Sequence, residues 1–193
     1  MRSIRIGVLA AAAATLGLAG LAAIASAQEK KGMEMPKPGM EQQKMSYFVG
    51  KWHSTGTLKP GPWGPGGAMS GDDTCSLMPG GFFVVCNSEG SGPLGKMNGL
   101  GVMGYDAEKK VYTWNGFNNM GENERAEGTV SGKVWTYRGE NSMGGKKLQT
   151  RYTITEASAS SYDFKAESSE NGTTWTTIME GHVTKTGSPA VKR

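Results

Sequence analysis

The chain has 193 residues, a length that suits one folded domain. Its 30 glycines would weaken helix interiors, which argues against a large helical protein. The formal charge of +4 arises from 21 basic and 17 acidic residues with interspersed signs. This near balance argues against a domain that binds nucleic acid.

Residues 1–27 have the pattern of an export signal. Arg2 and Arg5 precede an apolar stretch rich in alanine and leucine, which ends in Ala25-Ser26-Ala27. Small residues at these positions predict cleavage between Ala27 and Gln28. The alternative is a retained membrane anchor, but a span needs about 20 apolar residues and this stretch is only weakly hydrophobic. We therefore expect a mature protein without stable membrane insertion, either periplasmic or secreted.

Residues 28–38 are polar and contain proline, a composition that predicts a flexible leader. Residues 40–45 follow as one short helix with Met45 on its apolar side. Cu(I) prefers soft sulfur ligands, and four methionines in and after the leader could supply them: Met33, Met35, Met40 and Met45. The alternative is a linker in which methionine has no role.

From residue 50 onward, apolar and polar residues alternate with period two, which indicates half-buried strands. Asn171-Gly172 predicts a two-residue hairpin turn, because both turn positions need a positive φ. Antiparallel strands in unbroken succession favour an all-β, up-and-down barrel over residues 39–185, since closure removes exposed edges. A sandwich is the alternative, and residues 186–193 predict a disordered tail. We expect about ten strands, at residues 51–58, 68–78, 82–90, 97–105, 111–117, 124–131, 133–139, 146–155, 161–168 and 173–184.

The two cysteines predict a disulfide that staples a hairpin. Cys75 and Cys86 are symmetric about Gly80-Gly81, so a four-residue loop from Pro79 to Phe82 sets them directly opposite each other. An oxidising compartment favours pairing. The alternative is a redox dithiol, but the pair lacks the Cys-x-x-Cys spacing that lowers a thiol pKa.

Several short motifs occur in an order that resembles a known family. Phe48-Val49-Gly50-Lys51-Trp52, followed by Gly56, resembles the Gly-x-Trp motif at the first strand of lipocalin-like barrels. The segment 77–82, then Gly104-Tyr105-Asp106 with Lys110 and Tyr112, is similar to the bacterial DUF1579 family over about residues 38–185. This resemblance implies an exported lipocalin-like barrel with a helix across one end and no established reaction. The glycine- and proline-rich segment 60–67 departs from the family pattern.

The sequence shows no constellation typical of an enzyme, and we expect neither catalysis nor a cofactor. Gly99, Gly101 and Gly104 spell a dinucleotide fingerprint, but a strand follows where phosphate binding needs a helix. These glycines more readily let a strand bend or an aromatic ring pack closely. Five acidic residues could supply paired carboxylates, but their context indicates a solvated face: Asp72, Asp73, Glu122, Glu124 and Glu127.

The two histidines give no metal site by themselves. His53 alternates with the inner residue Trp52 and should point outward. Nitrobindins, lipocalin-like barrels of ten strands, bind haem through a histidine near the last strand, which makes His182 a haem candidate. The alternation of residues 175–183 argues that His182 also points outward.

The predicted inner face carries aromatic side chains, and Trp63 in the segment 60–67 could cover the mouth. A barrel of about eight to ten strands either fills its lumen or holds one small ligand. Six candidate cavity residues follow from the alternation: Trp52, Tyr105, Trp114, Tyr152, Phe164 and Trp175. We expect a binding protein for a small apolar ligand. The alternative is a structural or envelope-stress protein that acts through its surface, with an unknown protein partner.

Overall fold

A computed structural model describes residues 35–188 except residues 63 and 144–145, and at residues 143 and 146 it describes the backbone alone. The predicted export signal, the cleavage point between Ala27 and Gln28, Met33 and Trp63 lie outside the described residues. The chain divides into two units, residues 1–36 and 37–193. Every helix and strand given below belongs to the second unit.

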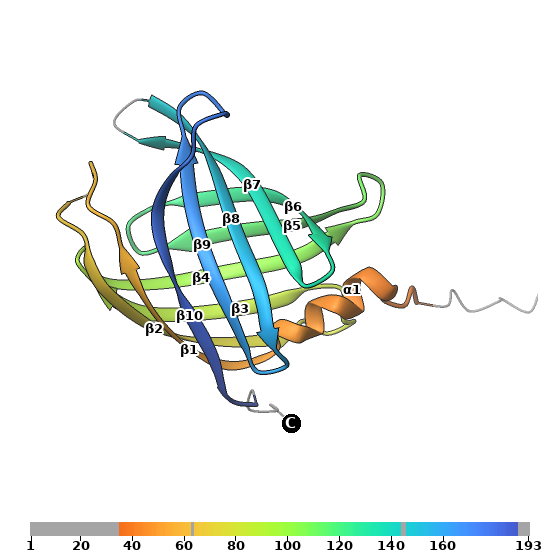
Figure 1. Cartoon of the computed structure of the whole chain (residues 1–193). Coiled ribbons are helices and arrows are strands. Elements are labelled where there is room, and N and C mark those ends of the chain that lie inside the picture. Colours follow the sequence, from red (N-terminus) through yellow and green to blue (C-terminus); the bar gives the residue numbers. More distant parts are fainter. Residues whose placement is uncertain (1–34, 63, 144–145, 189–193) are drawn as a thin grey trace, which may run out of the picture. The chain divides into compact units, whose positions relative to one another are not determined.

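The second unit is a closed antiparallel barrel, as the alternation predicted (Figure 1). Each strand pairs with the next one along the chain, and β1 also pairs with β10. None of the ten described strands therefore has an unpaired edge on which another chain could add. The strands are β1 (Gly50–Leu58), β2 (Gly67–Leu77), β3 (Val84–Gly92), β4 (Gly95–Asp106), β5 (Val111–Asn118), β6 (Asn123–Ser131), β7 (Val134–Met143), β8 (Lys146–Ser158), β9 (Ser161–Ser169) and β10 (Thr176–Gly187).

The prediction of a two-residue turn at Asn171-Gly172 is wrong. β9 ends at Ser169 and β10 begins at Thr176, so a longer loop joins them. Gly172 has a φ of 75°, but Asn171 does not share this conformation. Its carboxamide oxygen instead accepts the backbone N–H of Thr173 and that of Thr174, each at 2.9 Å. Asparagine here forms a side-chain turn, which competes with the tight hairpin that its sequence suggests.

A short helical segment closes one end of the barrel (Figure 1). It consists of α1 (Met40–Lys44) and the 3-10 helix η1 (Met45–Phe48), so the predicted helix continues for another turn. Met45 and Phe48 are buried, and the carbonyl oxygen of Phe48 accepts the indole N–H of Trp52 at 2.7 Å. Within the described residues, no helix has the length and apolar character needed to cross a membrane.

The tightly packed core lies at this closed end. Phe48 meets the ring of Trp135 edge-on at 5.0 Å, and Tyr112 meets the same ring at 4.8 Å. Trp52 and Val84 are also fully buried there. Burial of each large side chain contributes about 1.5–3 kcal/mol, so this end of the lumen is filled and stable.

Candidate functional site

Most of the aromatic residues predicted to face the lumen do so. Trp52 is buried at the closed end of the barrel. Tyr105 packs against the same core, and the Tyr105 ring lies 5.0 Å from the Tyr112 ring. Trp114, Tyr152 and Phe164 occupy inward register positions along the middle and open half of the barrel. Tyr152 and Phe164 stack with ring centroids 6.0 Å apart.

Trp175 is the exception, and its assignment to the lumen is wrong. It precedes β10, and a register shift between Thr177 and Met179 breaks the alternation on which the prediction depended. Its ring lies on the outer wall, 4.3 Å from the guanidinium of Arg151, which pairs with Glu167 at 2.7 Å. Glu167 is therefore buried although it lies on the outer face of β9.

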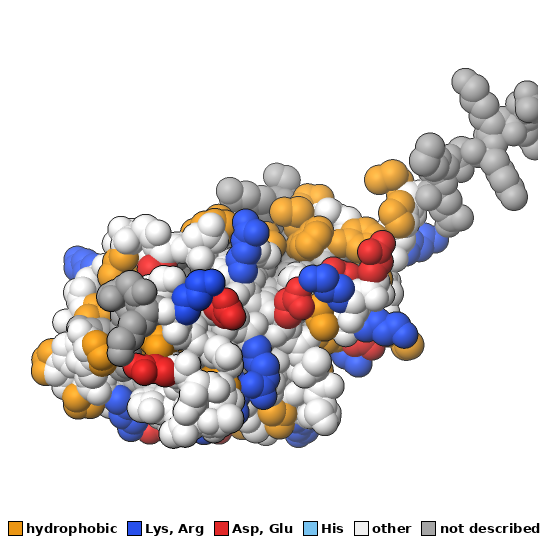
Figure 2. Space-filling view, turned by 90° about the horizontal axis from the view of Figure 1, so that it is seen from above, with side chains coloured by type: hydrophobic (Ala, Val, Ile, Leu, Met, Phe, Trp, Pro, Cys, Tyr) orange, Lys and Arg blue, Asp and Glu red, His pale blue; other side chains and the backbone are white. Residues whose placement is uncertain are grey.

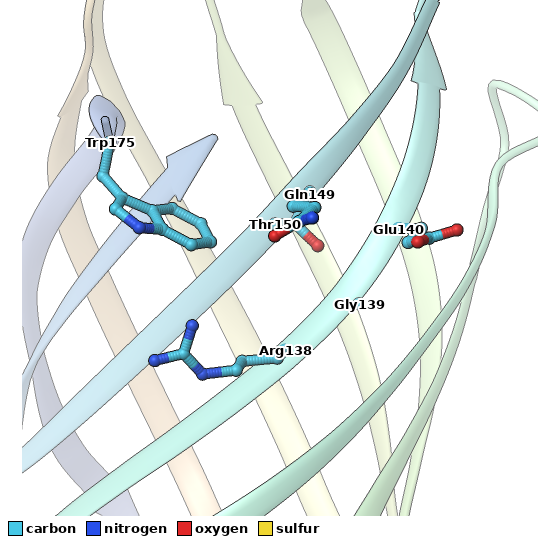
Figure 3. Close-up of a pocket in the computed structure, with 6 residues that line it drawn as sticks. All are labelled: Arg138, Gly139, Glu140, Gln149, Thr150 and Trp175. Carbon is cyan, nitrogen blue, oxygen red and sulfur yellow. The ribbon is translucent and has the colours of Figure 1, made fainter. Parts of the chain in front are cut away.

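A hollow of about 280 Å³ opens beside Trp175 on this outer wall. Figure 3 shows the side chain of Arg138 extending toward the Trp175 ring, whereas that of Glu140 points away. The Arg138 guanidinium is 5.6 Å from the ring centroid, within cation–π range. Trp175 thus covers a charged surface outside the barrel and lines no part of the lumen.

Glycines that face the lumen let several aromatic rings pack directly against the strand backbone. A Cβ built on Gly101 would lie 2.1 Å from the Trp114 ring, and one on Gly128 would lie 2.6 Å from the Tyr137 ring. A Cβ on Gly181 would lie 2.7 Å from the Phe164 ring. The missing side chains let these rings lie directly against the strand backbone of the barrel wall. This agrees with the interpretation of the glycine-rich stretch of β4 as a packing feature.

Two carboxyl groups face the lumen, where the sequence suggested a solvated surface. Asp73 lies opposite Trp52 and Ser88 in the register, and Ser88 donates a hydrogen bond to it. Glu124 lies opposite Gly116 and accepts a hydrogen bond from the Trp114 indole. Burial raises the pKa of both carboxyls above the ordinary value. The shared parity of Asp73 with the buried Cys75, and of Glu124 with Ala126, was the signal that could have found them.

The hydroxyls of Tyr137 and Tyr152 face the lumen without a hydrogen-bond partner in the described part of the chain. Tyr137 is 4% exposed, and its hydroxyl is an unpaired buried group. Tyr152 keeps part of its surface accessible, yet burial raises its pKa well above the ordinary value, with Tyr162, Asp73 and Glu124 adding to the shift. The side chain of Tyr152 therefore faces the lumen without being fully covered by its neighbours.

Both histidines lie outside the barrel. The Nδ1 atom of His53 is 2.9 Å from Asp72, and that of His182 is 2.7 Å from Asp163, all on exposed side chains. His182 therefore does not face the lumen, where the haem alternative requires it. Over the described residues, no three histidine, cysteine or acidic side chains gather in a group that could hold a metal ion.

The methionines of the predicted copper site do not form one surface group in the described region. Met40 is 79% exposed, whereas Met45 is fully buried under the closed end of the barrel. Burial removes the Met45 thioether from any site that the exposed methionines could form.

Cys75 and Cys86 form a disulfide, with their Cα atoms 4.0 Å apart. They lie directly opposite each other on β2 and β3, and both are buried. The loop register follows the predicted symmetry, because the backbone N–H of Met78 donates to the carbonyl oxygen of Phe83 at 2.9 Å. The bond staples the strand that carries Asp73 to the strand that carries Ser88.

A second hollow, of about 430 Å³, lies at the closed end, lined by Lys44, Tyr47, Val130, Gly132, Trp135 and Glu156. The polar groups that line this hollow are engaged in hydrogen bonds within the protein. The indole of Trp135 donates to Glu156 at 2.7 Å, and the Tyr47 hydroxyl donates to the carbonyl oxygens of Ser158 and Ser161. The unpartnered Tyr137 hydroxyl and the two inward carboxyls make the lumen the better candidate site.

Comparisons with known proteins give a family and a fold. No curated protein matches the sequence. The crystal structure of Rv2717c from M. tuberculosis is similar, with a TM-score of 0.56 and 14% identity, over 76% of this chain and 98% of that one. The structure of EF1p2_mFAP2b bound to DFHBI has a TM-score of 0.42 and 11% identity, over 75% and 98% of the two chains. At these identities the first likeness shows a shared barrel fold.

A family profile matches residues 37–185, which include β1 to β9 and all but the last two residues of β10. It is described as a protein of unknown function, DUF1579, and it is the family that the motifs around Pro79 and Tyr105 resemble. The chain belongs to the DUF1579 family.

Proposed function

We propose that this protein binds one small, mostly apolar molecule in the open half of its barrel and does so without catalysis. The observation that carries the proposal is the contrast between the two halves of the lumen. The closed half is filled by fully buried Trp52 and Trp135, whereas Trp114 and Tyr152 in the open half keep accessible surface. Aromatic walls with a few polar groups are typical of small-molecule pockets.

The packing of rings on glycine supports an open lumen. Any larger residue in place of Gly101 would displace the Trp114 ring toward the centre of the barrel, and any larger residue in place of Gly181 would displace the Phe164 ring. Glycine in a strand weakens it, by about 0.5–1 kcal/mol relative to alanine. The presence of glycine at several inward positions in spite of this cost supports an open lumen.

Native mass spectrometry of protein isolated from its source tests this proposal. A co-purifying mass that denaturation releases is the expected result. Gly99→Leu adds a side chain inside the open half, where its Cβ meets Phe117 O at 3.3 Å, and should lower the occupancy. Thr129→Leu places a leucine at an exposed position and is the control. Equal occupancy in both variants would contradict binding in the lumen.

We also propose that the protein is exported and loses residues 1–27. The basic start, apolar stretch and Ala25-Ser26-Ala27 support this proposal. Amino-terminal sequencing of protein from the cell envelope and the medium should begin at Gln28. An amino terminus at Met1 in mature protein would contradict cleavage.

The outer surface favours a second candidate, binding of another protein. Figure 2 shows basic and acidic side chains beside one another on the face seen there. By contrast, several large apolar residues are 40–50% exposed around the β4–β5 sheet: Leu94, Met97, Leu100, Phe117 and Met120. Leu100 lies opposite Phe117 on neighbouring strands. If this pair binds a partner, Leu100→Ser with Phe117→Ser should abolish cross-linking to it and leave the lumen occupancy unchanged.

A further inference from the structure

The lumenal carboxyls have no basic partner. Asp73 accepts a hydrogen bond from Ser88, and Glu124 accepts one from Trp114. No ion pair joins either carboxyl to a lysine, arginine or histidine in the described part of the chain. A partly buried carboxylate without a cation is costly, and such groups are usually paired or functional.

The two carboxyls both occupy inward register positions on the wall of the barrel, although they come from distant strands. Asp73 is on β2 and Glu124 is on β6, with three strands between them on the shorter way around the barrel. Both nevertheless contribute to the raised pKa of Tyr152, which lies on β8. A group bound near the Tyr152 hydroxyl would therefore feel the charge of both carboxylates.

The remaining groups of this region suit an ammonium ion. The hydroxyls of Tyr137 and Tyr152 lack hydrogen-bond partners among the described residues, and Tyr137 is more than nine-tenths buried on the inner wall. A hydroxyl oxygen can accept an ammonium N–H. The rings of Trp114, Tyr152 and Phe164 supply faces that attract a cation, and Trp114 lies beside Glu124.

We propose that the molecule bound in the lumen carries a positively charged amine on an apolar body, and that Asp73 and Glu124 recognise the amine. This inference rests on the proposed function, since it names the ligand class of the same site. The ammonium ion offsets the unpaired charge of the carboxylates, and the apolar body packs on the aromatic walls. Binding of an amine then explains why the barrel keeps two partly buried carboxyls without a basic partner.

Two probes of the same shape test the charge requirement. 2-Phenylethylamine carries an ammonium ion, and 2-phenylethanol replaces it with a hydroxyl. Binding is measured by isothermal titration calorimetry and by the tryptophan fluorescence change that is absent from Trp114→Phe. We expect the amine to bind about tenfold more tightly than the alcohol, because charge-assisted hydrogen bonds are the stronger kind.

Variants then assign the effect to the two carboxyls. Asp73→Asn and Glu124→Gln should each weaken amine binding by about fivefold or more and change alcohol binding by less than about twofold. Glu89→Gln removes the same charge from an exposed position on the outside of β3 and should leave both probes unaffected. Unchanged alcohol binding also shows that each variant is folded.

The outcomes separate the two proposals. If the amine and the alcohol bind with equal affinity and both change Trp114 fluorescence, the lumen binds small molecules but the amine inference is wrong. The inference is also wrong if Glu89→Gln weakens amine binding as much as Asp73→Asn does. If neither probe binds at millimolar concentrations and the purified protein carries no ligand, both proposals fail.

Discussion

Gly101 provides the sharpest test of how the lumen is built. A Cβ at this position would lie 2.1 Å from Cη2 and 2.6 Å from Cζ2 of Trp114. The Trp114 indole is also the hydrogen-bonding neighbour of the Glu124 carboxyl. Gly101→Ala therefore forces the ring to move and to lose this bond. Gly99→Ala is the matched control on the same strand, since its Cβ meets nothing closer than Phe117 O at 3.3 Å.

The expected magnitude follows from two opposing terms. Overpacking costs about 1–3 kcal/mol, whereas alanine in place of glycine stabilises a compatible site by about 0.4–1 kcal/mol. Gly101→Ala should thus lower the free energy of unfolding by about 0.5–2 kcal/mol, and Gly99→Ala should change it by about 0.5 kcal/mol or less. At this chain length, 1 kcal/mol corresponds to a shift of about 2–4 °C in Tm.

Urea unfolding of Gly101→Ala in the wild-type and Trp114→Phe backgrounds tests whether the clash with the Trp114 ring causes the loss of stability. In Trp114→Phe the ring is smaller and cannot bond to Glu124, so Gly101→Ala should lose most of its cost there. The coupling in this double-mutant cycle should reach about 1 kcal/mol. The reasoning is refuted if Gly101→Ala matches Gly99→Ala in the wild-type background, or if it is equally destabilising in both backgrounds.

Three further predictions concern the staple, the lumenal acid and the histidine. Cys75→Ala with Cys86→Ala should lower the free energy of unfolding by about 2–3 kcal/mol, from a closed loop of about 12 residues, and two reactive thiols in denatured, non-reduced protein would contradict the bond. Burial raises the pKa of Asp73 above 3.8, so the native state binds the Asp73 proton more tightly than the unfolded state does. The contribution of Asp73 to the free energy of unfolding therefore falls as pH rises from about 4 through the folded pKa. Asp73→Asn should therefore gain stability over wild type between about pH 4 and 7 in urea titrations, and a loss over this range would show the opposite sign. Haemin should give no Soret shift that depends on His182, and a tight spectral complex abolished by His182→Ala would overturn this expectation.

Local patterns carried most of the information about the fold. The period-two alternation around Tyr152 and Phe164 predicts half-buried strands, because successive side chains on a strand point to opposite faces. The symmetry of Cys75 and Cys86 about Gly80-Gly81 predicts the hairpin register, since each step along one strand is matched on its partner. The barrel follows from many such strands joined by short turns.

The inner surface depended on features that no local pattern reports. The register shift before Met179 places Trp175 outside, and a bulge of this kind inverts the alternation without changing the sequence pattern. Asp73 and Glu124 appeared solvated because acidic residues are rarely found inside. The tertiary structure turns them inward, since closure of the sheet gives every strand one inner face, whatever residues it carries. Rings that lie on Gly101 and Gly181 then leave these carboxyls beside a lumen, and that depends on neighbours which only the closed barrel brings together.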